Sequence, residues 1–398
     1  MENKLKFRGL ECIVYLDSYK KVGDGVVDAY IDFRLDKDFA LFRRSMNYPE
    51  TTATYIELQS LKTSKRLFQG CYYKLNLDLL KNYQFERNDD SLLIGASFDV
   101  GNMPAPTDNA DELLQSHELL DPEDLSMSNV PRNVSFNVNV QPGWELFVKN
   151  VGQANWNELR SGDRVEVVYD AGAELQASAT EVTRIFNSRK TSLEQSKPIL
   201  VISHWDKDHI HCLKYLTNQD ISNCFSKLIC VDKLRSITSS GILTRFKTVL
   251  GTQNVFCLPL PARTNGIDMH RWRCCGDVAF YQGERSRNIN YCGLVMFVHG
   301  SKATASLTGD CKLSQAKDVY KQEKARGINT NEHILVAPHH GGDYGASSRF
   351  YDTPCDNILI SVGAGNTYGH PQKDMKSYLE SLGTVERTDE VGDIVKEL

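Results

Sequence analysis

The hexapeptide HWDKDH, which begins at His204, places four metal-capable side chains within six residues. It starts one residue after an apolar run that ends at Ile202 and is typical of a buried strand. Because alternate residues at a strand end point the same way, His204, Asp206 and Asp208 can converge on one cleft. A following turn lets His209 join them. Imidazoles and carboxylates are the common ligands of divalent metals, so the hexapeptide predicts metal-dependent hydrolysis.

Three more polar clusters lie just past the ends of apolar runs. They are Thr308-Gly309-Asp310, Pro338-His339-His340-Gly341-Gly342 and Tyr368-Gly369-His370-Pro371. Together with the hexapeptide they contain five of the ten histidines of the chain. A single cluster of this kind is typical of a turn or of a polar core residue. Four of them at strand ends predict a binuclear metal site.

In order and approximate spacing, the clusters resemble the metallo-β-lactamase superfamily, and within it the branch that contains the hydrolase domain of the competence protein ComEC. The superfamily signature HxHxDH is present here with Asp206 in place of the second histidine. The segments VGQAN at Val151 and YDAGA at Tyr169 resemble that branch's VGQGD and IDxG motifs. The resemblance covers the chain from about Trp144 onwards. It implies an α/β (α+β) fold, an αββα sandwich with the metal cleft at one edge of its two sheets.

The resemblance also implies a ligand set for two divalent ions, zinc or manganese. In this set Asp310 bridges the ions, His339 closes site one and His370 closes site two. The full set is His204 and Asp206 for site one, Asp208 and His209 for site two, and Asp310, His339 and His370. A carboxylate at Asp206 makes site one harder, which favours Mn²⁺ or even Mg²⁺, with zinc as the alternative.

Further residues have expected roles beside these ligands. Adjacent residues of an extended segment point opposite ways, so His340 is either the ligand in place of His339 or a contact for a substrate phosphate. We expect Asp208, His340 and Asn366 to take part in catalysis, and Asp170 to orient a ligating imidazole. Two ions about 3.5–4 Å apart can activate a water molecule and bind both oxygens of an in-line phosphoryl displacement. The other histidines are expected to be structural or exposed: His117, His211, His270, His299 and His333.

The chain has 398 residues and a net charge of −5, so it has no overall basic character. Any nucleic-acid contact must come from a local basic patch, which surface lysines on solvated helices would explain equally well. The candidate residues are Lys227, Lys233, Arg235, Arg245, Lys247, Arg285 and Arg287. Eleven cysteines without a CxxC pair suit free or buried thiols in a reducing cytoplasm. No run reaches the roughly 18 apolar residues of a membrane span, so we expect a cytoplasmic protein without a membrane partner.

The elements that position these clusters begin only in the second third of the chain. We predict a β-rich N-terminal domain over 1–100, an acidic, proline-containing linker over 101–133 with a short helix at 111–120, and the hydrolase domain over 134–398. In the first domain, Val27, Ala29, Ile31 and Phe33 alternate with polar residues, which predicts a half-buried strand. In the last domain, buried strands at 199–202, 294–298, 334–336 and 358–362 are separated by helices.

Three functions are compatible with this organisation. The first is a phosphodiesterase or nuclease that acts on DNA or another nucleic acid, as the resemblance implies. The second is a small-molecule phosphodiesterase or ester hydrolase, which suits the acidic composition. The third is an effector subunit of a multi-protein complex, such as a defence complex, that docks a protein partner through its N-terminal domain.

Overall fold

The computed structural model describes residues 10–50, 55–64, 67–81, 83–88, 92–97, 113–116, 138–232, 234–261, 268–284, 286, 288–327, 332–342, 355–366 and 369–398. The chain forms two compact units. The first comprises Met1–Asp124 and Arg235–Gly241, and the second comprises Leu125–Leu234 and Ile242–Leu398. No helix within the described ranges is long and apolar enough to cross a membrane.

Among the described residues, the first unit contains one seven-stranded sheet and the helices α1 and α2, with the strand order β5-β6-β3-β2-β1-β4-β7. Its elements are β1 (Glu11–Gly23), β2 (Val26–Phe33), α1 (Asp36–Met46), β3 (Tyr55–Lys62), β4 (Cys71–Asn76), α2 (Leu77–Leu80), β5 (Tyr83–Asn88), β6 (Leu92–Ser97) and β7 (Leu114–Ser116). Strand β7 lies inside the segment expected to be a linker and pairs antiparallel with β4. The helix predicted at 111–120 is therefore wrong for these residues, because backbone pairing with β4 decides their conformation. Leu113, directly before β7, is helical and buried, and the rest of 101–133 lies outside the described residues.

Strand β2 is buried on both faces. The apolar face packs into a core with α1, as its alternation predicted. The other face carries Asp28, Tyr30 and Asp32, and these side chains are buried as well. The prediction of a half-buried strand is therefore wrong, because β1 contributes further polar side chains to the same face: Tyr15 lies opposite Asp32 in the register, and its hydroxyl accepts a hydrogen bond from the Arg235 guanidinium.

The second unit contains two seven-stranded sheets. The first has the order β13-β12-β11-β10-β9-β8-β21 and the second β14-β15-β16-β17-β18-β19-β20. The strands are β8 (Trp144–Val148), β9 (Asn157–Ser161), β10 (Arg164–Tyr169), β11 (Ile199–Ile202), β12 (Lys227–Val231), β13 (Val255–Leu258), β14 (Met269–Cys275), β15 (Val278–Gly283), β16 (Leu294–His299), β17 (Ala303–Leu307), β18 (Glu332–Val336), β19 (Asn357–Ile360), β20 (Thr384–Arg387) and β21 (Ile394–Glu397). The helices are α4 (Ala179–Ser196), α5 (Lys207–Lys214), α6 (Asn218–Cys224), α7 (Ile237–Leu250), α8 (Leu313–Lys324), α9 (Lys373–Glu380) and α10 (Thr388–Val391).

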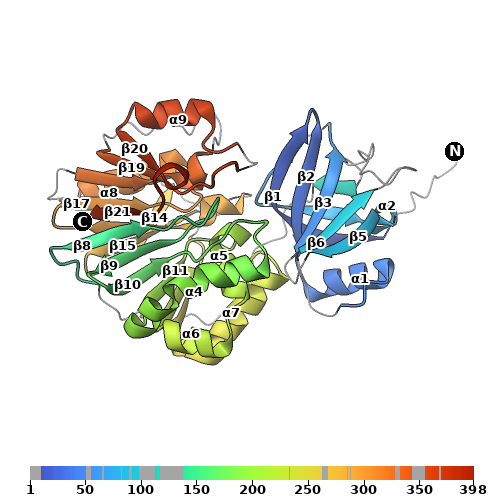
Figure 1. The fold of residues 1–398 in the computed structure, drawn as a ribbon, viewed down its shortest axis with the longest axis horizontal. Helices are drawn as coiled ribbons and strands as arrows, with labels where there is room; N and C mark the ends of the chain where they lie inside the picture. Colours follow the sequence, from blue (N-terminus) through green and yellow to red (C-terminus); the bar gives the residue numbers. More distant parts are fainter. Residues whose placement is uncertain are drawn as a thin grey trace. The chain divides into compact units, whose positions relative to one another are not determined.

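Helices cover the outer faces of both sheets, which makes the second unit an αββα sandwich, the fold expected from the resemblance. In Figure 1, α4, α6 and α7 lie on one side of this unit and α9 lies on the other. Apolar side chains of both sheets, such as Val201 and Leu307, share the central core. A separate apolar cluster joins the outer face of the second sheet to α8 and α9, through residues such as Val319 and Leu379. Nine cysteines are free thiols, and eight of them are buried: Cys12, Cys212, Cys224, Cys230, Cys257, Cys292, Cys311 and Cys355.

Both sheets contain a parallel half, and these halves position the site. Strands β10 to β13 run parallel in the first sheet, and β17 to β20 run parallel in the second. Polar loops follow β10, β11, β17 and β18 directly. Because the carboxyl ends of parallel strands meet at one edge of a sheet, these loops can bring their side chains together.

Candidate metal centre

The hexapeptide begins in a loop and ends on a helix. Strand β11 ends at Ile202, and α5 begins at Lys207. Asp208 and His209 therefore lie in the first turn of α5, and the extended alternation expected for this segment stops at Asp206. The side chains converge nevertheless, because the helix turns Asp208 and His209 towards the strand edge. His204, Asp206 and His209 are completely buried.

Asp170 fixes the direction of two imidazoles. It directly follows β10, with φ of 61°, and its Oδ2 accepts a hydrogen bond from Nδ1 of His209 at 2.8 Å. Its carboxylate also accepts hydrogen bonds from the Ser203 backbone N–H at 2.7 Å and hydroxyl at 2.8 Å. Since that hydroxyl donates to Asp170, it accepts from Nδ1 of His204 at 2.9 Å. Both Nε2 atoms are therefore left without their proton in the neutral form, which suits a metal ligand.

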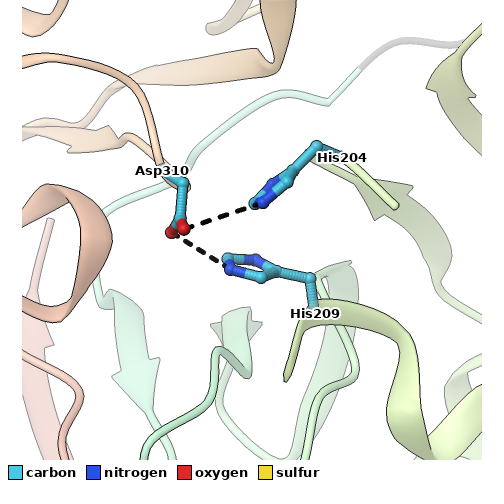
Figure 2. A group of neighbouring side chains, drawn as sticks. All are labelled: His204, His209 and Asp310. Atoms are coloured by element: carbon cyan, nitrogen blue, oxygen red, sulfur yellow. Dashed lines mark ion pairs between the residues drawn. The ribbon is translucent and has the colours of Figure 1, made fainter. Parts of the chain in front are cut away.

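Asp310 faces both of these imidazoles (Figure 2). Its Oδ1 lies 3.1 Å from Nε2 of His209, and its Oδ2 lies 3.8 Å from Nε2 of His204. His204, His209 and Asp310 each offer a ligand atom within 4.8 Å of the other two. Asp206 joins them at 3.3 Å, between its Oδ2 and Nε2 of His204. A carboxylate with one oxygen towards each imidazole is the geometry expected of a bridging ligand.

His339 and His340 both face the centre. They lie in a short 3-10 turn (η4, Pro338–Gly341) and both have left-handed backbone angles, with φ of 50° and 54°. The expectation that these adjacent side chains point opposite ways assumed an extended segment, and it is wrong for that reason. Nδ1 of His339 contacts Asp310 Oδ2. Two consecutive non-glycine residues in this region imply local strain of about 1–3 kcal/mol each.

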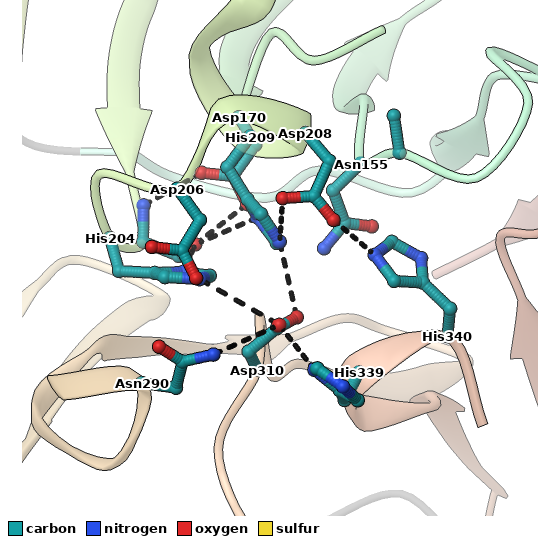
Figure 3. A network of polar contacts seen from close by, with 12 residues as sticks. Asn155, Asp170, His204, Asp206, Asp208, His209, Asn290, Asp310, His339 and His340 are labelled. Carbon is teal, nitrogen blue, oxygen red and sulfur yellow. Dashed lines mark hydrogen bonds and ion pairs between the residues drawn. The ribbon is translucent and has the colours of Figure 1, made fainter. Parts of the chain in front are cut away.

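His340 forms a second group with Asp208 and His209 (Figure 3). Its Nδ1 donates to the carbonyl oxygen of Ser361 at 2.7 Å, and its Nε2 lies 3.2 Å from Asp208 Oδ2. Asp208 Oδ1 lies 3.8 Å from Nε2 of His209. The described residues therefore group His340 with the residues expected for site two, in the place that was expected for His370.

His370 belongs to neither donor group among the described residues. Nε2 of Gln153 lies 2.8 Å from its Nδ1. The side chain of Asn366 forms hydrogen bonds with the backbone of the same loop. It accepts one from the His370 N–H at 3.0 Å. It donates to the carbonyl oxygens of His370 and Gly363 at 2.6 and 3.1 Å. Both ends of the Asn366 amide thus form hydrogen bonds within the loop, and its expected part in catalysis stays a prediction. Tyr368 lies outside the described residues.

The charges of the centre depend strongly on one another. Burial favours neutral His209, but the carboxylates of Asp208, Asp310 and Asp170 outweigh it and hold the pKa of His209 well above its usual value. Burial likewise opposes ionisation of Asp310, yet His339 and His209 hold its pKa well below the usual value. Burial opposes the charged form of His340 as well, but its hydrogen bond to Asp208 and the charges of Asp310 and Asp208 together outweigh burial and raise its pKa.

The buried imidazoles and carboxylates of the centre fit divalent metal. Nε2 of His204, Nε2 of His209 and Oδ1 of Asp310 are buried and have no hydrogen-bond partner. Such atoms are costly in an interior unless a cation satisfies them. The same imidazoles are held through the opposite nitrogen, which is the usual support of metal-ligating histidines. Imidazole and carboxylate donors suit zinc or manganese.

Four polar residues near the centre were not predicted from the sequence. Ser203 links Asp170 to His204, and Gln153 contacts His370. Asn290 donates to Asp310 Oδ2 at 3.5 Å, and the buried side chain of Asn155 lies beside Asp208 and His340 in Figure 3. Gln153 and Asn155 belong to the VGQAN segment that carried the resemblance, so that motif could have indicated them. The loop that holds Asn290 contains no comparable signal.

The other described histidines lie apart from the centre, as expected. His211 lies in α5 and contacts the Glu174 carbonyl oxygen at 3.0 Å. His333 is buried against aromatic rings, and His299 pairs with Glu323 at 2.7 Å. His270 lies in β14 and is partly buried. His117 lies outside the described residues.

Two of the seven candidate residues for a basic patch form hydrogen bonds with the protein itself. Arg235 is buried, and Arg245 donates to three carbonyl oxygens, those of Leu213, Lys214 and Leu216. These two guanidinium groups form hydrogen bonds within the protein, because a buried donor without a partner is costly. Lys233, Arg285 and Arg287 lie outside the described residues.

The comparisons with known proteins identify neighbours in structure but none in sequence. No protein-family model and no curated protein sequence matches the chain. A metal-dependent hydrolase of the β-lactamase superfamily aligns at 11% identity and a TM-score of 0.38, covering 64% of this chain and 99% of its own. The metallo-β-lactamase fold protein YhfI of Bacillus subtilis aligns at 10% identity and a TM-score of 0.35, covering 63% and 99%. The diiron β-hydroxylase CmlA of Streptomyces venezuelae aligns at 13% identity and a TM-score of 0.36, covering 65% of this chain and 55% of its own.

Proposed function

We propose that this chain is a metal-dependent hydrolase that cleaves phosphodiesters, with two divalent ions held by the centre described above. One observation carries the proposal: two buried donor groups share His209, and the carboxylate of Asp310 lies beside it. Paired ions in such a site supply an activated water molecule and bind the oxygens of a phosphoryl group. The resemblance to the ComEC-like branch favours the same reaction.

The protein's own residues bind and orient the reaction's components. Asp170 and Ser203 hold His204 and His209 in the tautomers that leave Nε2 available. The Ser361 carbonyl oxygen does the same for His340. Burial excludes bulk water from these groups, which strengthens electrostatic interactions at the centre.

Two substrate classes follow from different observations. Nucleic acid is the substrate that the resemblance favours. A small phosphodiester is favoured by the net charge of −5 and by the internal use of Arg235 and Arg245. A protein that neutralises several DNA phosphates loses affinity steeply with salt. We therefore expect a steep salt dependence only if DNA is the substrate.

The test compares substrates and metals in one protein preparation. Metal-stripped protein is reloaded with Mn²⁺ or Zn²⁺ and assayed on an aryl phosphodiester, a cyclic nucleotide, and single- and double-stranded DNA. We expect hydrolysis of at least one substrate, and a loss of about 100-fold or more in Asp208→Asn. The matched control is His333→Gln, a buried histidine remote from both donor groups. Protein that binds two metals but hydrolyses none of these substrates would contradict the proposal.

A further inference from the structure

We infer that Lys312 binds a second phosphate of the substrate, next to the phosphodiester that is cleaved, and that Tyr291 holds its ammonium group in place. The inference rests on the proposed function, because it names the substrate class of the same site. That class is a phosphodiester that carries a neighbouring phosphate, as in a short oligonucleotide.

Two loops bring this pair to the metal centre. Asn290 and Asp310 face each other in Figure 3, and the Asn290 amide donates to Asp310 Oδ2 at 3.5 Å. Tyr291 directly follows Asn290, and Lys312 lies two residues after Asp310. Consecutive Cα atoms are about 3.8 Å apart, so the Cα atoms of Lys312 and Asp310 are separated by at most about 7.6 Å. The pair therefore belongs to the immediate surroundings of the candidate ligands.

Gln315 fixes the two loops to each other. Its side chain is buried in the first turn of α8. Its Oε1 accepts a hydrogen bond from the Lys312 backbone N–H, and its Nε2 donates to the Tyr291 carbonyl oxygen, both at 2.9 Å. A backbone N–H can only donate and a carbonyl oxygen can only accept, so these partners decide which end of the amide faces which loop. A Cβ atom added at Gly283 would lie 1.8 Å from the same Tyr291 oxygen, so this close approach requires glycine.

The ammonium group of Lys312 lies over an aromatic ring. Its Nζ is 4.1 Å from the centroid of the Tyr291 ring. No carboxylate of the described residues forms an ion pair with it, whereas Lys302, for example, pairs with Glu397 at 2.9 Å. A ring face attracts a cation without neutralising its charge. Lys312 and Tyr291 are both only partly buried, so this charge is available to an anion from solution.

A second phosphate is the ligand that suits this cation. In the proposed reaction the phosphoryl group being cleaved is bound at the metal centre, and Lys312 is not one of the candidate ligands there. Its positive charge therefore contacts a different part of the substrate. Lysine is a common phosphate-binding residue, and contacts between cations and phosphates position a nucleic acid without reading its sequence. An aryl phosphodiester has no second phosphate and cannot use this contact.

Binding can be measured without any turnover. Zinc-loaded, full-length protein is titrated with a non-cleavable phosphonate analogue of a thymidine dinucleotide, and with the same analogue carrying a 5′- or a 3′-phosphate. We expect one of the phosphorylated analogues to bind about 10-fold more tightly than the unphosphorylated one. This preference should disappear in Lys312→Met, and Lys312→Arg should keep part of it. The salt dependence of binding should also weaken by about one counterion in Lys312→Met.

Two further positions separate a substrate contact from a structural role. Tyr291→Phe keeps the ring face and should keep the preference, whereas Tyr291→Leu should reduce it about 3-fold. Lys321→Met removes an exposed lysine of the same helix, and this matched control should bind all three analogues as the unmodified protein does.

Equal binding of the phosphorylated and unphosphorylated analogues by the unmodified protein would overturn the inference, and so would a preference that persists in Lys312→Met. With cleavable dinucleotides, the ratio of kcat/KM for the phosphorylated over the unphosphorylated substrate should fall in Lys312→Met from about 10 to about 1. If no phosphodiester is hydrolysed at all, the proposed function fails, and the analogue titrations still decide whether Lys312 binds a phosphate.

Discussion

At the scale of single residues, the hydrogen bond on the far nitrogen of each imidazole decides what its near nitrogen can do. Asp170, Ser203 and the Ser361 carbonyl oxygen accept protons from three histidines. The side-chain amide of Gln153 contacts Nδ1 of the fourth, His370. Residue type and spacing indicated which histidines gather, but the partner of each ring depends on loops distant in sequence. The ring partners of the histidines therefore could not be predicted from the hexapeptide or from the later motifs.

The grouping of His340 with Asp208 and His209 predicts the effect of removing it. We expect His340→Ala to lose one of two bound metals, or to bind it at least about 100-fold more weakly, because a ligand of site two is missing. Elemental analysis after dialysis against low metal measures the stoichiometry. His333→Gln is the control and should keep both ions. Full metal content in His340→Ala would instead favour the alternative that this histidine contacts a substrate phosphate.

His333 makes stability depend on pH. It is buried between Phe297 and Tyr320, and burial lowers its pKa from 6.5 to about 3. The unfolded chain therefore binds this proton more readily, so the contribution of His333 is complete above about pH 6.5 and falls as the pH decreases towards 3. Because of this group, we expect the free energy of unfolding to be about 2 kcal/mol lower at pH 5 than at pH 7.

Urea unfolding of metal-stripped protein at pH 7 and pH 5 measures that loss, since removing metal excludes its own pH dependence. His333→Gln keeps a hydrogen-bonding side chain but has no proton to gain. Between pH 7 and pH 5, the free energy of unfolding of this variant should therefore fall by about 2 kcal/mol less than that of the unmodified protein. Equal losses in the two proteins would show that His333 does not titrate in this way.

At the scale of elements, apolar runs predicted the strands that carry the site, because such strands are buried on both faces. The run at 199–202 matches β11, and the runs at 294–298 and 334–336 fall within β16 and β18. The loops behind them were less predictable. The paired left-handed residues of η4 and the early start of α5 arise from tertiary contacts, and periodicity contains no information about them.

The loops that carry the ligands are joined by their backbones at Gly172. Its N–H donates to the Asn155 carbonyl oxygen at 2.8 Å, and the Asn155 N–H donates to the Asp208 carbonyl oxygen at 3.0 Å. A Cβ atom at Gly172 would lie 1.7 Å from that Asp208 oxygen. The first turn of α5, with Asp208 and His209, would have to move to admit it.

We therefore expect Gly172→Ala to destabilise the protein by about 1–3 kcal/mol and to weaken metal binding in parallel. Chemical unfolding and metal titration measure the two effects. Gly241→Ala is the matched control, because nothing lies within 4 Å of a Cβ atom there and the residue lies inside α7. It should stabilise the helix by about 0.5–1 kcal/mol. Metal affinity that is unchanged in Gly172→Ala would show that this backbone junction does not position the ligands.

At the scale of the whole molecule, the chain crosses between its two units more often than the predicted order of domain, linker and domain implies. Arg235–Gly241 belongs to the N-terminal unit, although the residues on both sides belong to the second unit. The domain boundaries read from composition could not include such a segment, because it has no distinctive sequence. A role of the N-terminal unit in docking a protein partner stays a prediction.

A substitution at Arg235 tests whether the metal centre of the second unit depends on the stability of the N-terminal unit. Its guanidinium donates to the Tyr15 hydroxyl, and its carbonyl oxygen accepts from the Tyr72 hydroxyl at 2.9 Å. Arg235→Met removes the charge and its hydrogen bonds, so we expect the N-terminal unit to lose about 1.5–3 kcal/mol and to be proteolysed faster. The metal content of the second unit should not change, because Arg235 belongs to the N-terminal unit and the candidate ligands belong to the second. Lys247→Met, a change of charge on the part of α7 in the second unit, should affect neither measurement. If Arg235→Met lost metal as fast as it lost protection from protease, the two units would be one cooperative structure, and the metal centre would depend on the N-terminal sheet.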